Sequence, residues 1–284
     1  MIVKNLKIFL QNVHKNSLIV NILLETLNQF NIILIQEPPW SEIQKIPSSS
    51  DSDREPLIGT TYHPNWILFA RIPSDSADFP RVIAYVNICL SSLRFLFRKD
   101  IINHRDIILI SFFNNNICYY IMNIYSDSSH TALNINNVLL MTGDFNIRNS
   151  LWDASFLFQS SISDDLVIRA DSFNLALSTP TNPCSTRYSD MAGESNSMID
   201  LMFLRYGSPE LDQHLIHPDS QLFSDHAPLS IDIPIVEEVI LTSKLSLAPK
   251  SDQENAFIED IILNFKIMDT SNIDDTEMLK CAVN

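Results

Sequence analysis

Five short polar segments of the chain carry side chains that could act on a phosphate, and each lies within or at the end of an apolar run. The segments are Gln11-Asn12, Gln36-Glu37-Pro38, Gly143–Asn146, Ser224-Asp225-His226, and Asp200 within Met198–Leu204. Carboxylates with an amide can hold a hard divalent cation, and an imidazole oriented by a buried carboxylate can act on phosphate or water. The combination indicates hydrolysis of a phosphodiester, which needs an activated water and stabilisation of added negative charge.

Taken one at a time, most of these residues also have ordinary structural explanations. Turns, solvated strand ends and surface positions would account for Asn12, Glu37, Asp144, Asn146, Asp225 and His226. Asp200 is harder to explain in this way, because a carboxylate inside an apolar stretch needs a partner, and a histidine is the natural one. Ser224, Asp225 and His226 do not form a nucleophilic triad, because consecutive residues on an extended segment point in alternating directions.

The hydrophobic pattern predicts the strands that position these segments. Leu6–Val13 alternates as a strand, a helix follows with Asn16 or Ser17 as its N-terminal cap, and Asn31–Gln36 forms a second strand. Further strands are predicted at Trp66–Ala70, Val82–Ile88, Leu93–Phe97, Ile107–Phe113, Ile117–Tyr125, Val138–Met141, Ile199–Leu204 and Leu229–Ile233, and a second helix at Asp164–Phe173. Hairpins mixed with strand-helix-strand units favour an α/β architecture of two packed mixed sheets flanked by helices over a doubly wound parallel sheet.

The composition excludes several classes of protein. Hydrophobic residues make up 45% of the 284 positions, and only four glycines are present, with no glycine-rich phosphate loop. Four widely spaced cysteines indicate neither a zinc cluster nor a disulfide framework. The N-terminus lacks the features of a signal peptide, and no apolar run approaches the roughly 18 residues of a membrane span. An intracellular protein with no membrane association is therefore expected.

The formal charge of −15 bears on how a substrate would be held. Residues 235–284 hold ten acidic and four basic residues, and we expect them to form an acidic tail after a domain of residues 1–234. A chain this acidic has too few Lys and Arg side chains for tight, non-specific binding of nucleic acid. Its carboxylates could instead hold a divalent cation, and that cation would contact the phosphate. Basic residues are concentrated between Arg81 and Arg105, at Arg81, Arg94, Arg98, Lys99 and Arg105. This basic concentration is either a solvated face of a hairpin or a contact for a DNA backbone.

The order of the motifs resembles that of a known superfamily. The motifs are QN at Gln11-Asn12, QEPPW at Gln36–Trp40, NIY at Asn123–Tyr125, GDFN at Gly143–Asn146, IDL at Ile199–Leu201 and SDHAPL at Ser224–Leu229. Together they resemble the endonuclease/exonuclease/phosphatase superfamily, and QEPPW with Trp152-Asp153 resembles the endonuclease domain of non-LTR (LINE-type) retrotransposons. The likeness covers roughly Lys7 to Pro234 and implies a DNase I-like, four-layered α/β sandwich.

The resemblance implies a metal site and a residue that activates water. Mg2+, with Mn2+ as the alternative, would be bound by Glu37. Asn12 would organise that site, and Asp225 would also lie near the metal. Asp144 would hold and activate the attacking water.

The remaining matched residues would contact the substrate. The resemblance makes His226 the phosphate-polarising or general-base histidine and Asp200 the carboxylate that orients it. Asn146 and Tyr125 would bind phosphate oxygens, and Asn123 would add an amide on the same edge of the sheet.

The resemblance also implies a partner and a setting. In such retroelements the domain nicks a DNA target, so that the exposed 3′-hydroxyl primes synthesis by a reverse-transcriptase domain of the same polyprotein. The present chain has no recognisable reverse-transcriptase segment, so we expect a truncated copy that needs access to the nucleus if it is active.

One departure from the superfamily keeps other functions open. Only 18 residues separate Tyr125 from Asp144, whereas relatives have a longer helical connection there. A crossover between parallel strands normally needs a dozen or more residues, so an element is missing by comparison. The alternatives to a DNA endonuclease are a phosphatase acting on small phosphate esters and an inactive, truncated remnant of the same fold.

Overall fold

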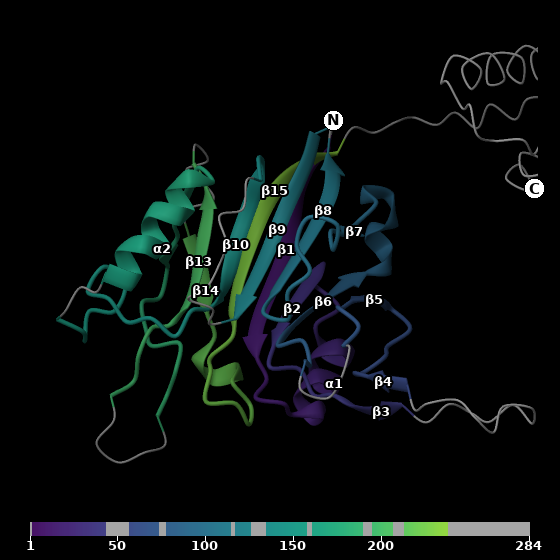
Figure 1. The fold of residues 1–284 in the computed structure, drawn as a ribbon, viewed down its shortest axis with the longest axis horizontal. Helices are drawn as coiled ribbons and strands as arrows, with labels where there is room; N and C mark the ends of the chain where they lie inside the picture. Colours follow the sequence, from purple (N-terminus) through teal and green to yellow (C-terminus); the bar gives the residue numbers. More distant parts are fainter. Residues whose placement is uncertain are drawn as a thin grey trace, which may run out of the picture. The chain divides into compact units, whose positions relative to one another are not determined.

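The computed structural model describes residues 2–43, 57–73, 78–114, 117–125, 135–157, 161–189, 195–206 and 213–237. All of them belong to the first of two compact units, Met1–Glu238. Two β-sheets pack against each other in this unit, and each carries a helix (Figure 1). The predicted architecture of two packed mixed sheets flanked by helices is confirmed.

The first sheet has seven strands in the order β12-β14-β15-β1-β2-β6-β5. In chain order they are β1 (Ile2–Asn12), β2 (Ile32–Gln36), β5 (Trp66–Phe69), β6 (Val82–Asn87), β12 (Thr179–Pro180), β14 (Gln213–Ile216) and β15 (Leu229–Glu237). β1 runs parallel to β2, with Asn12 opposite Gln36, because helix α1 connects them as a crossover. This pairing brings two of the polar segments to the same sheet edge.

The second sheet has six strands in the order β11-β13-β10-β9-β8-β7. In chain order they are β7 (Leu96–Phe97), β8 (Ile107–Asn114), β9 (Ile117–Tyr125), β10 (Val138–Asp144), β11 (Leu175–Leu177) and β13 (Asp200–Arg205). β8 and β9 form the predicted hairpin, with Asn114 opposite Ile117. A separate two-stranded ribbon joins β3 (Ser41–Ile43) to β4 (Leu57–Gly59).

Helix α1 (Ser17–Thr26) begins where its cap was predicted, because the Asn16 side chain accepts hydrogen bonds from the backbone N–H groups of Leu18 and Ile19. Helix α2 (Ser161–Ser172) starts three residues before the predicted Asp164. The 3-10 helix η3 (Pro218–Ser220) follows β14. The predicted strand Leu93–Phe97 is wrong over its first half, where the 3-10 helix η1 spans Ile88–Leu93 and only Leu96–Phe97 pairs with β8.

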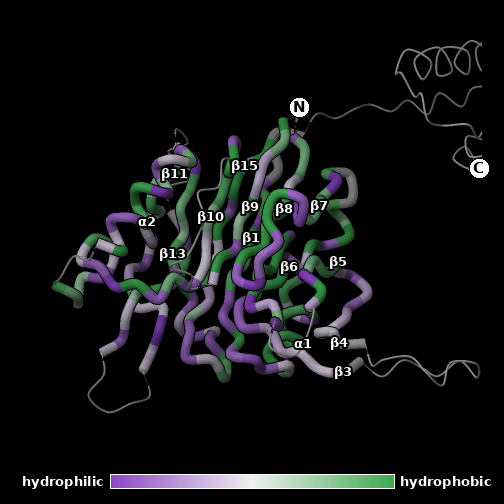
Figure 2. The backbone as a smooth tube through the Cα atoms, in the orientation of Figure 1, coloured by the Kyte–Doolittle hydropathy of each residue, from purple (hydrophilic) through white to green (hydrophobic). Residues whose placement is uncertain are grey.

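Alternation along β1 divides the core into two layers. Leu6, Ile8 and Leu10 are buried between the two sheets. Phe9 and Val13 face the other way and pack against α1. Figure 2 shows the same division at the level of the chain, with hydrophobic residues concentrated in the strands and hydrophilic residues in many of the connections. The strands are therefore fixed on both sides of the first sheet, which holds their polar ends in place.

The domain boundary predicted at Pro234 stays a prediction. β15 runs through Pro234 to Glu237, and Ile235 is buried in the core. Residues 238–284, which make up nearly all of the predicted acidic tail, lie outside the described residues. Cys89, Cys118 and Cys184 are free thiols. Of the helices that the structure describes, none has the length and apolar character to cross a membrane.

The buried His214 of β14 should make stability depend on pH. Burial lowers the pKa of its imidazole to about 4, below the ordinary value of 6.5. Between about pH 6.5 and pH 4, His214 is protonated in the unfolded chain but neutral in the folded chain, so stability falls as pH drops through this range. We expect a loss of about 2 kcal/mol between pH 7 and pH 5 from this group. Urea unfolding of wild type and His214→Asn should show a shallower pH dependence in the variant. Equal slopes would contradict the assignment.

Candidate active site

The polar strand ends meet at one edge of the two sheets. Asn12 ends β1, Glu37 follows β2, and Tyr125 and Asp144 end the parallel pair β9 and β10 directly opposite each other. β1 and β10 belong to different sheets, yet the Asn12 amide nitrogen lies 3.2 Å from Asp144 Oδ2. The site therefore forms where the carboxyl ends of strands from both sheets converge.

Asn12 and Tyr125 hold the Glu37 carboxylate. The Asn12 Nδ2 group donates to Glu37 Oε1 at 3.3 Å, and the Tyr125 hydroxyl donates to the same oxygen at 2.6 Å. Asn12 Oδ1 accepts the backbone N–H of His14 at 3.0 Å, so the NH2 group is the part of Asn12 that faces the carboxylates. Asn12 thus organises Glu37 and Asp144 and keeps its oxygen engaged elsewhere.

His226 is anchored by Asp200 and faces two further carboxylates. Its Nδ1 lies 2.8 Å from Asp200 Oδ2, as the buried aspartate in the apolar stretch suggested. Its Nε2 lies 3.9 Å from Asp144 Oδ2 and 3.8 Å from Asp225 Oδ1. His226, Asp200 and Asp144 are all buried, whereas Asp225 is partly exposed and also pairs with Arg187 at 3.4 Å.

The cluster changes the protonation of its members. Burial opposes the charged imidazolium, but Asp200, Asp144 and Asp225 outweigh that effect and raise the pKa of His226 to about 9. Burial, together with the nearby charge of Asp200, raises the pKa of Asp144 to about 7, although His226 acts in the opposite direction. At neutral pH His226 is therefore protonated, and Asp144 lies near its titration midpoint. Burial and the hydrogen bond to Glu37 also raise the pKa of Tyr125.

Backbone conformations with positive φ gather at this edge. His14, Lys15, Glu37 and Asn146 have φ values of 47°, 58°, 47° and 50°. The Asn146 N–H donates to Asp144 Oδ1 at 3.0 Å, and the Lys15 N–H donates to the Glu37 carbonyl at 2.7 Å. Non-glycine residues occupy this region at a cost, and such positions cluster where a side chain must be aimed.

Two residues outside the predicted catalytic and metal-binding set support the site: Thr186, and Arg81 of the basic concentration. The Thr186 hydroxyl accepts the backbone N–H groups of Ile199 and Asp200 at 3.0 Å each, which fixes the start of β13. Arg81 lies over the Tyr125 ring, 4.6 Å from its centroid, and pairs with Asp106. These residues stand in segments without a recognisable motif, so only their neighbours in space reveal them.

Trp152 and Asp153 support the loop that follows Asp144. The Trp152 indole N–H donates to the Ile147 carbonyl at 3.1 Å. Asp153 pairs with Arg148 at 3.0 Å and accepts the backbone N–H of Met198 at 3.4 Å. The pair therefore ties the loop after β10 to the segment that leads to Asp200.

Asn123 and Asn146 differ in their access to a substrate. Asn146 is exposed beside Asp144. Asn123 is fully buried; its amide donates to the carbonyls of Ile35 and Ile83, and its oxygen accepts from Gln36 Nε2 at 3.2 Å. Asn123 therefore joins the two sheets beneath the site, in place of the substrate contact expected for it.

The site contains side chains that could hold a metal ion. Among the residues that the structure describes, Asp144, Asp200 and His226 offer ligand atoms within 4.8 Å of one another. A protonated imidazole bound to Asp200 offers no lone pair, however, so His226 is a poor ligand in this arrangement. Glu37 and Asp225 lie outside this group and offer further carboxylate oxygens, which are the ligands of hard divalent cations.

The comparisons with known proteins agree with this geometry. A family model described as endonuclease-reverse transcriptase matches residues 107–230. The endonuclease domain of TRAS1, a telomere-specific non-LTR retrotransposon, superposes with a TM-score of 0.57 at 13% identity, covering 81% of this chain and 98% of that one. The chain has the endonuclease/exonuclease/phosphatase fold. The predicted resemblance to this superfamily and to retrotransposon endonucleases is confirmed.

Other structures with this superfamily fold are similarly distant in sequence. AP endonuclease LMAP from Leishmania major has a TM-score of 0.55 at 10% identity, covering 81% of this chain and 88% of that one. An endonuclease/exonuclease/phosphatase family protein from Leptotrichia buccalis C-1013-b has a TM-score of 0.50 at 13% identity, covering 81% and 100%. A search among curated proteins found no match.

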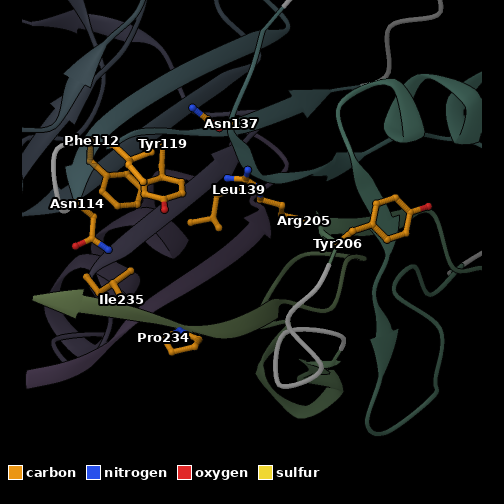
Figure 3. Close-up of a pocket in the computed structure, with 10 residues that line it drawn as sticks. Phe112, Asn114, Tyr119, Asn137, Leu139, Arg205, Tyr206, Pro234 and Ile235 are labelled. Carbon is orange, nitrogen blue, oxygen red and sulfur yellow. The ribbon is translucent and has the colours of Figure 1, made fainter.

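A cavity of about 340 Å³ lies away from the site (Figure 3). Phe112, Tyr119, Leu139 and Ile235 line it, together with Arg205. Phe112, Tyr119 and Leu139 come from the end of β8 and the start of β9 and β10, whereas Tyr125 and Asp144 end their strands. Arg205 ends β13, and Ile235 belongs to β15. The cavity therefore lies at the opposite ends of β9 and β10 from the carboxylate cluster.

Proposed function

We propose that the chain is a Mg2+-dependent endonuclease that hydrolyses DNA phosphodiester bonds and derives from a retrotransposon. The observation that supports this most is the convergence of Glu37, Asp144 and the His226–Asp200 pair, from strand ends far apart in sequence, into one connected cluster. A cluster of carboxylates around a protonated imidazole suits an anionic substrate only if further positive charge is present.

The donor set fits a hard divalent cation. Asn12 holds the carboxylates of Glu37 and Asp144 at 3.3 and 3.2 Å from the same nitrogen, and Asp225 Oδ1 lies 3.8 Å from His226 Nε2. The raised pKa of Asp144 reflects burial and neighbouring negative charge, which a cation would offset. Mg2+ bound by Glu37, with Asp144 and Asp225 nearby, would supply positive charge against the phosphate.

The protonation states divide the roles of Asp144 and His226. Asp144, buried at the end of β10, offers the carboxylate that can accept the proton of an attacking water. His226, with a pKa of about 9, stays protonated and donates a hydrogen bond from Nε2 to a phosphate oxygen. Asp200 fixes the orientation of the ring, and the exposed Asn146 offers its amide to the phosphate.

The parent protein is proposed to have carried a reverse transcriptase. The description of the matching family model joins an endonuclease to a reverse transcriptase. A nick that leaves a 3′-hydroxyl would supply the primer for such a partner domain. On this proposal the natural substrate is a DNA target, and the reaction takes place where the protein has access to the nucleus.

Conversion of supercoiled plasmid to open circles tests the proposal. We expect wild-type protein to nick plasmid in the presence of Mg2+ and not in EDTA. The Glu37→Gln variant should nick about 100-fold more slowly or worse, because the substitution removes one carboxylate charge. Asp232→Asn is the matched control, since Asp232 lies on β15 and pairs with Lys7.

Two further measurements separate the alternatives. Turnover of soluble phosphate esters in place of plasmid would favour a phosphatase. Intact plasmid, together with a melting temperature that does not change on adding Mg2+, would identify an inactive remnant, because a ligand that binds only the folded state must stabilise it.

A further inference from the structure

A second cavity adjoins the carboxylate cluster and has no role in the proposed reaction. It measures about 400 Å³, and Glu37 forms part of its wall. Trp40, Phe79 and three prolines make up its apolar lining, and Lys15, Arg81 and Arg105 supply its cations. We call this feature the Trp40 cavity. Volumes of this order are typical of small-molecule and cofactor sites.

The Trp40 cavity is built on a frame of hydrogen-bonded backbone. The Glu37 N–H donates to the Arg81 carbonyl at 2.8 Å, and the Arg81 N–H donates to the Arg105 carbonyl at 2.7 Å. Lys15 is tied to Glu37 in the same way at 2.7 Å. The Trp40 indole N–H donates to the Pro80 carbonyl at 2.7 Å, which fixes the ring. Four segments distant in sequence are thus held in place around one opening.

The walls of the cavity suit a flat aromatic group. The rings of Trp40 and Phe79 are nearly parallel, at 4°, with centroids 5.9 Å apart. Trp40 is half-buried, whereas Trp66 and Trp152 are buried, so only one of the three tryptophans shows substantial exposure. A planar ring that enters the cavity can extend this stack, as bases do on the aromatic platforms of proteins that bind single strands.

The charge of the cavity suits a phosphate-linked group. Three cationic side chains and one carboxylate line it, in a chain whose formal charge is −15. Arg81 and Arg105 both approach Asp106, the latter at 3.7 Å, so the guanidinium groups are positioned. The remaining carboxylate is Glu37, the proposed metal ligand. Aromatic walls, a cationic rim and a phosphodiester-cleaving centre alongside describe a site for a nucleotide.

We propose that the Trp40 cavity binds an unpaired nucleotide of the DNA strand, next to the phosphodiester that the carboxylate cluster attacks. The base stacks on Trp40 and Phe79, and the flanking phosphate meets Arg105 and Lys15. A base inside a duplex already has both faces stacked, so only one that has left the helix can enter. The inference rests on the proposed endonuclease function and adds a preference for single-stranded or locally unpaired DNA.

Tryptophan fluorescence gives a test that does not depend on catalysis. In EDTA, a single-stranded DNA oligonucleotide should quench the emission of the full chain, and the fully paired duplex should quench it much less. Anisotropy of the labelled oligonucleotide should show affinity weakened about 5- to 100-fold in Trp40→Ala and close to wild type in Trp40→Phe, as expected for the loss of one stacked base.

Two further variants guard against local unfolding at Trp40. Phe79→Ala removes the second ring and Arg105→Gln removes a cation, and both should weaken binding while the melting temperature stays near wild type. Tyr206→Ala is the matched control, because Tyr206 is an exposed aromatic residue at the opposite edge, beside the other cavity. Unchanged oligonucleotide affinity in folded Trp40→Ala and Phe79→Ala would overturn the proposal.

Nicking assays separate this inference from the function on which it rests. Wild type should cut a duplex with one unpaired nucleotide faster than its fully paired counterpart, and Trp40→Ala should lose that difference. If wild type nicks both duplexes at the same rate, the proposed nucleotide subsite is wrong, while the proposed endonuclease activity is supported. Quenching that depends on Trp40, in a protein that does not nick, would support the subsite and overturn the proposed activity.

Discussion

Asp144→Asn should abolish nicking and, in the absence of metal, make the protein more stable. The substitution keeps the shape of the side chain but removes the oxygen that accepts a proton near neutral pH, so we expect a loss of about 10²- to 10⁴-fold in nicking rate. The gain in stability follows from the pKa of about 7, which burial and Asp200 raise above the value in the unfolded chain. Ionising Asp144 therefore costs folding free energy, and that cost builds up as pH rises from about 4 to about 7.

The difference in stability between Asp144→Asn and wild type should depend on pH. An asparagine does not ionise, so the melting temperature of the variant should exceed that of wild type by a few degrees at pH 8 and converge with it toward pH 4. Thermal unfolding in EDTA at both pH values, alongside Asp232→Asn, checks this. A variant that is less stable than wild type at pH 8 would show that the charge of Asp144 is net favourable, chiefly through His226.

The sequence could predict the site because its residues lie at strand ends. Parallel pairing of β1 with β2 and of β9 with β10 brings Asn12, Glu37, Tyr125 and Asp144 to one edge, whatever the packing details. The partnership of Asp200 with His226 could also be expected, because an aspartate inside an apolar strand needs a hydrogen-bonding partner.

Other features depended on contacts that no local pattern encodes. Asn123 lies two residues before Tyr125 and on the same face of β9, but it is farther from the strand end and fully buried, where Gln36 and two carbonyls satisfy it. The Trp40 cavity requires Phe79 and Arg105 from segments without a recognisable motif. Short strands such as β12 form through pairing with β14 and carry little hydrophobic signal of their own.

The length of the connection between β9 and β10 does not determine the position of Asp144. The 18 residues between Tyr125 and Asp144 predict that an element present in relatives is missing between these two strands. The structure keeps β10 parallel to β9, with Asp144 opposite Tyr125, and every residue of β10 is buried. Residues 126–134 of the connection lie outside the described residues. The position of Asp144 therefore depends on strand pairing on both sides, with β13 as the second partner.

Gly143→Ala should have the largest effect on stability of any single substitution proposed for this chain. A Cβ at this position would lie 1.8 Å from the Ile124 carbonyl oxygen and 2.7 Å from its carbon, both backbone atoms of the paired strand β9. It would also approach Gln36 Nε2 at 2.9 Å, the group that binds Asn123 and the same Ile124 carbonyl. Neither backbone atom can move without separating β9 from β10.

The expected cost is at least about 4 kcal/mol, which belongs to the range where core strain decides whether a domain folds. A protein that still folds should melt about 10 °C lower or more, and it should lose nicking because Asp144 follows directly in the chain. Gly59→Ala in β4 is the matched control, since of the described glycines only Gly143 has a positive φ. A Gly143→Ala protein with the stability of wild type would contradict the close pairing of β9 and β10, and with it the placement of Asp144 opposite Tyr125 on which the site depends.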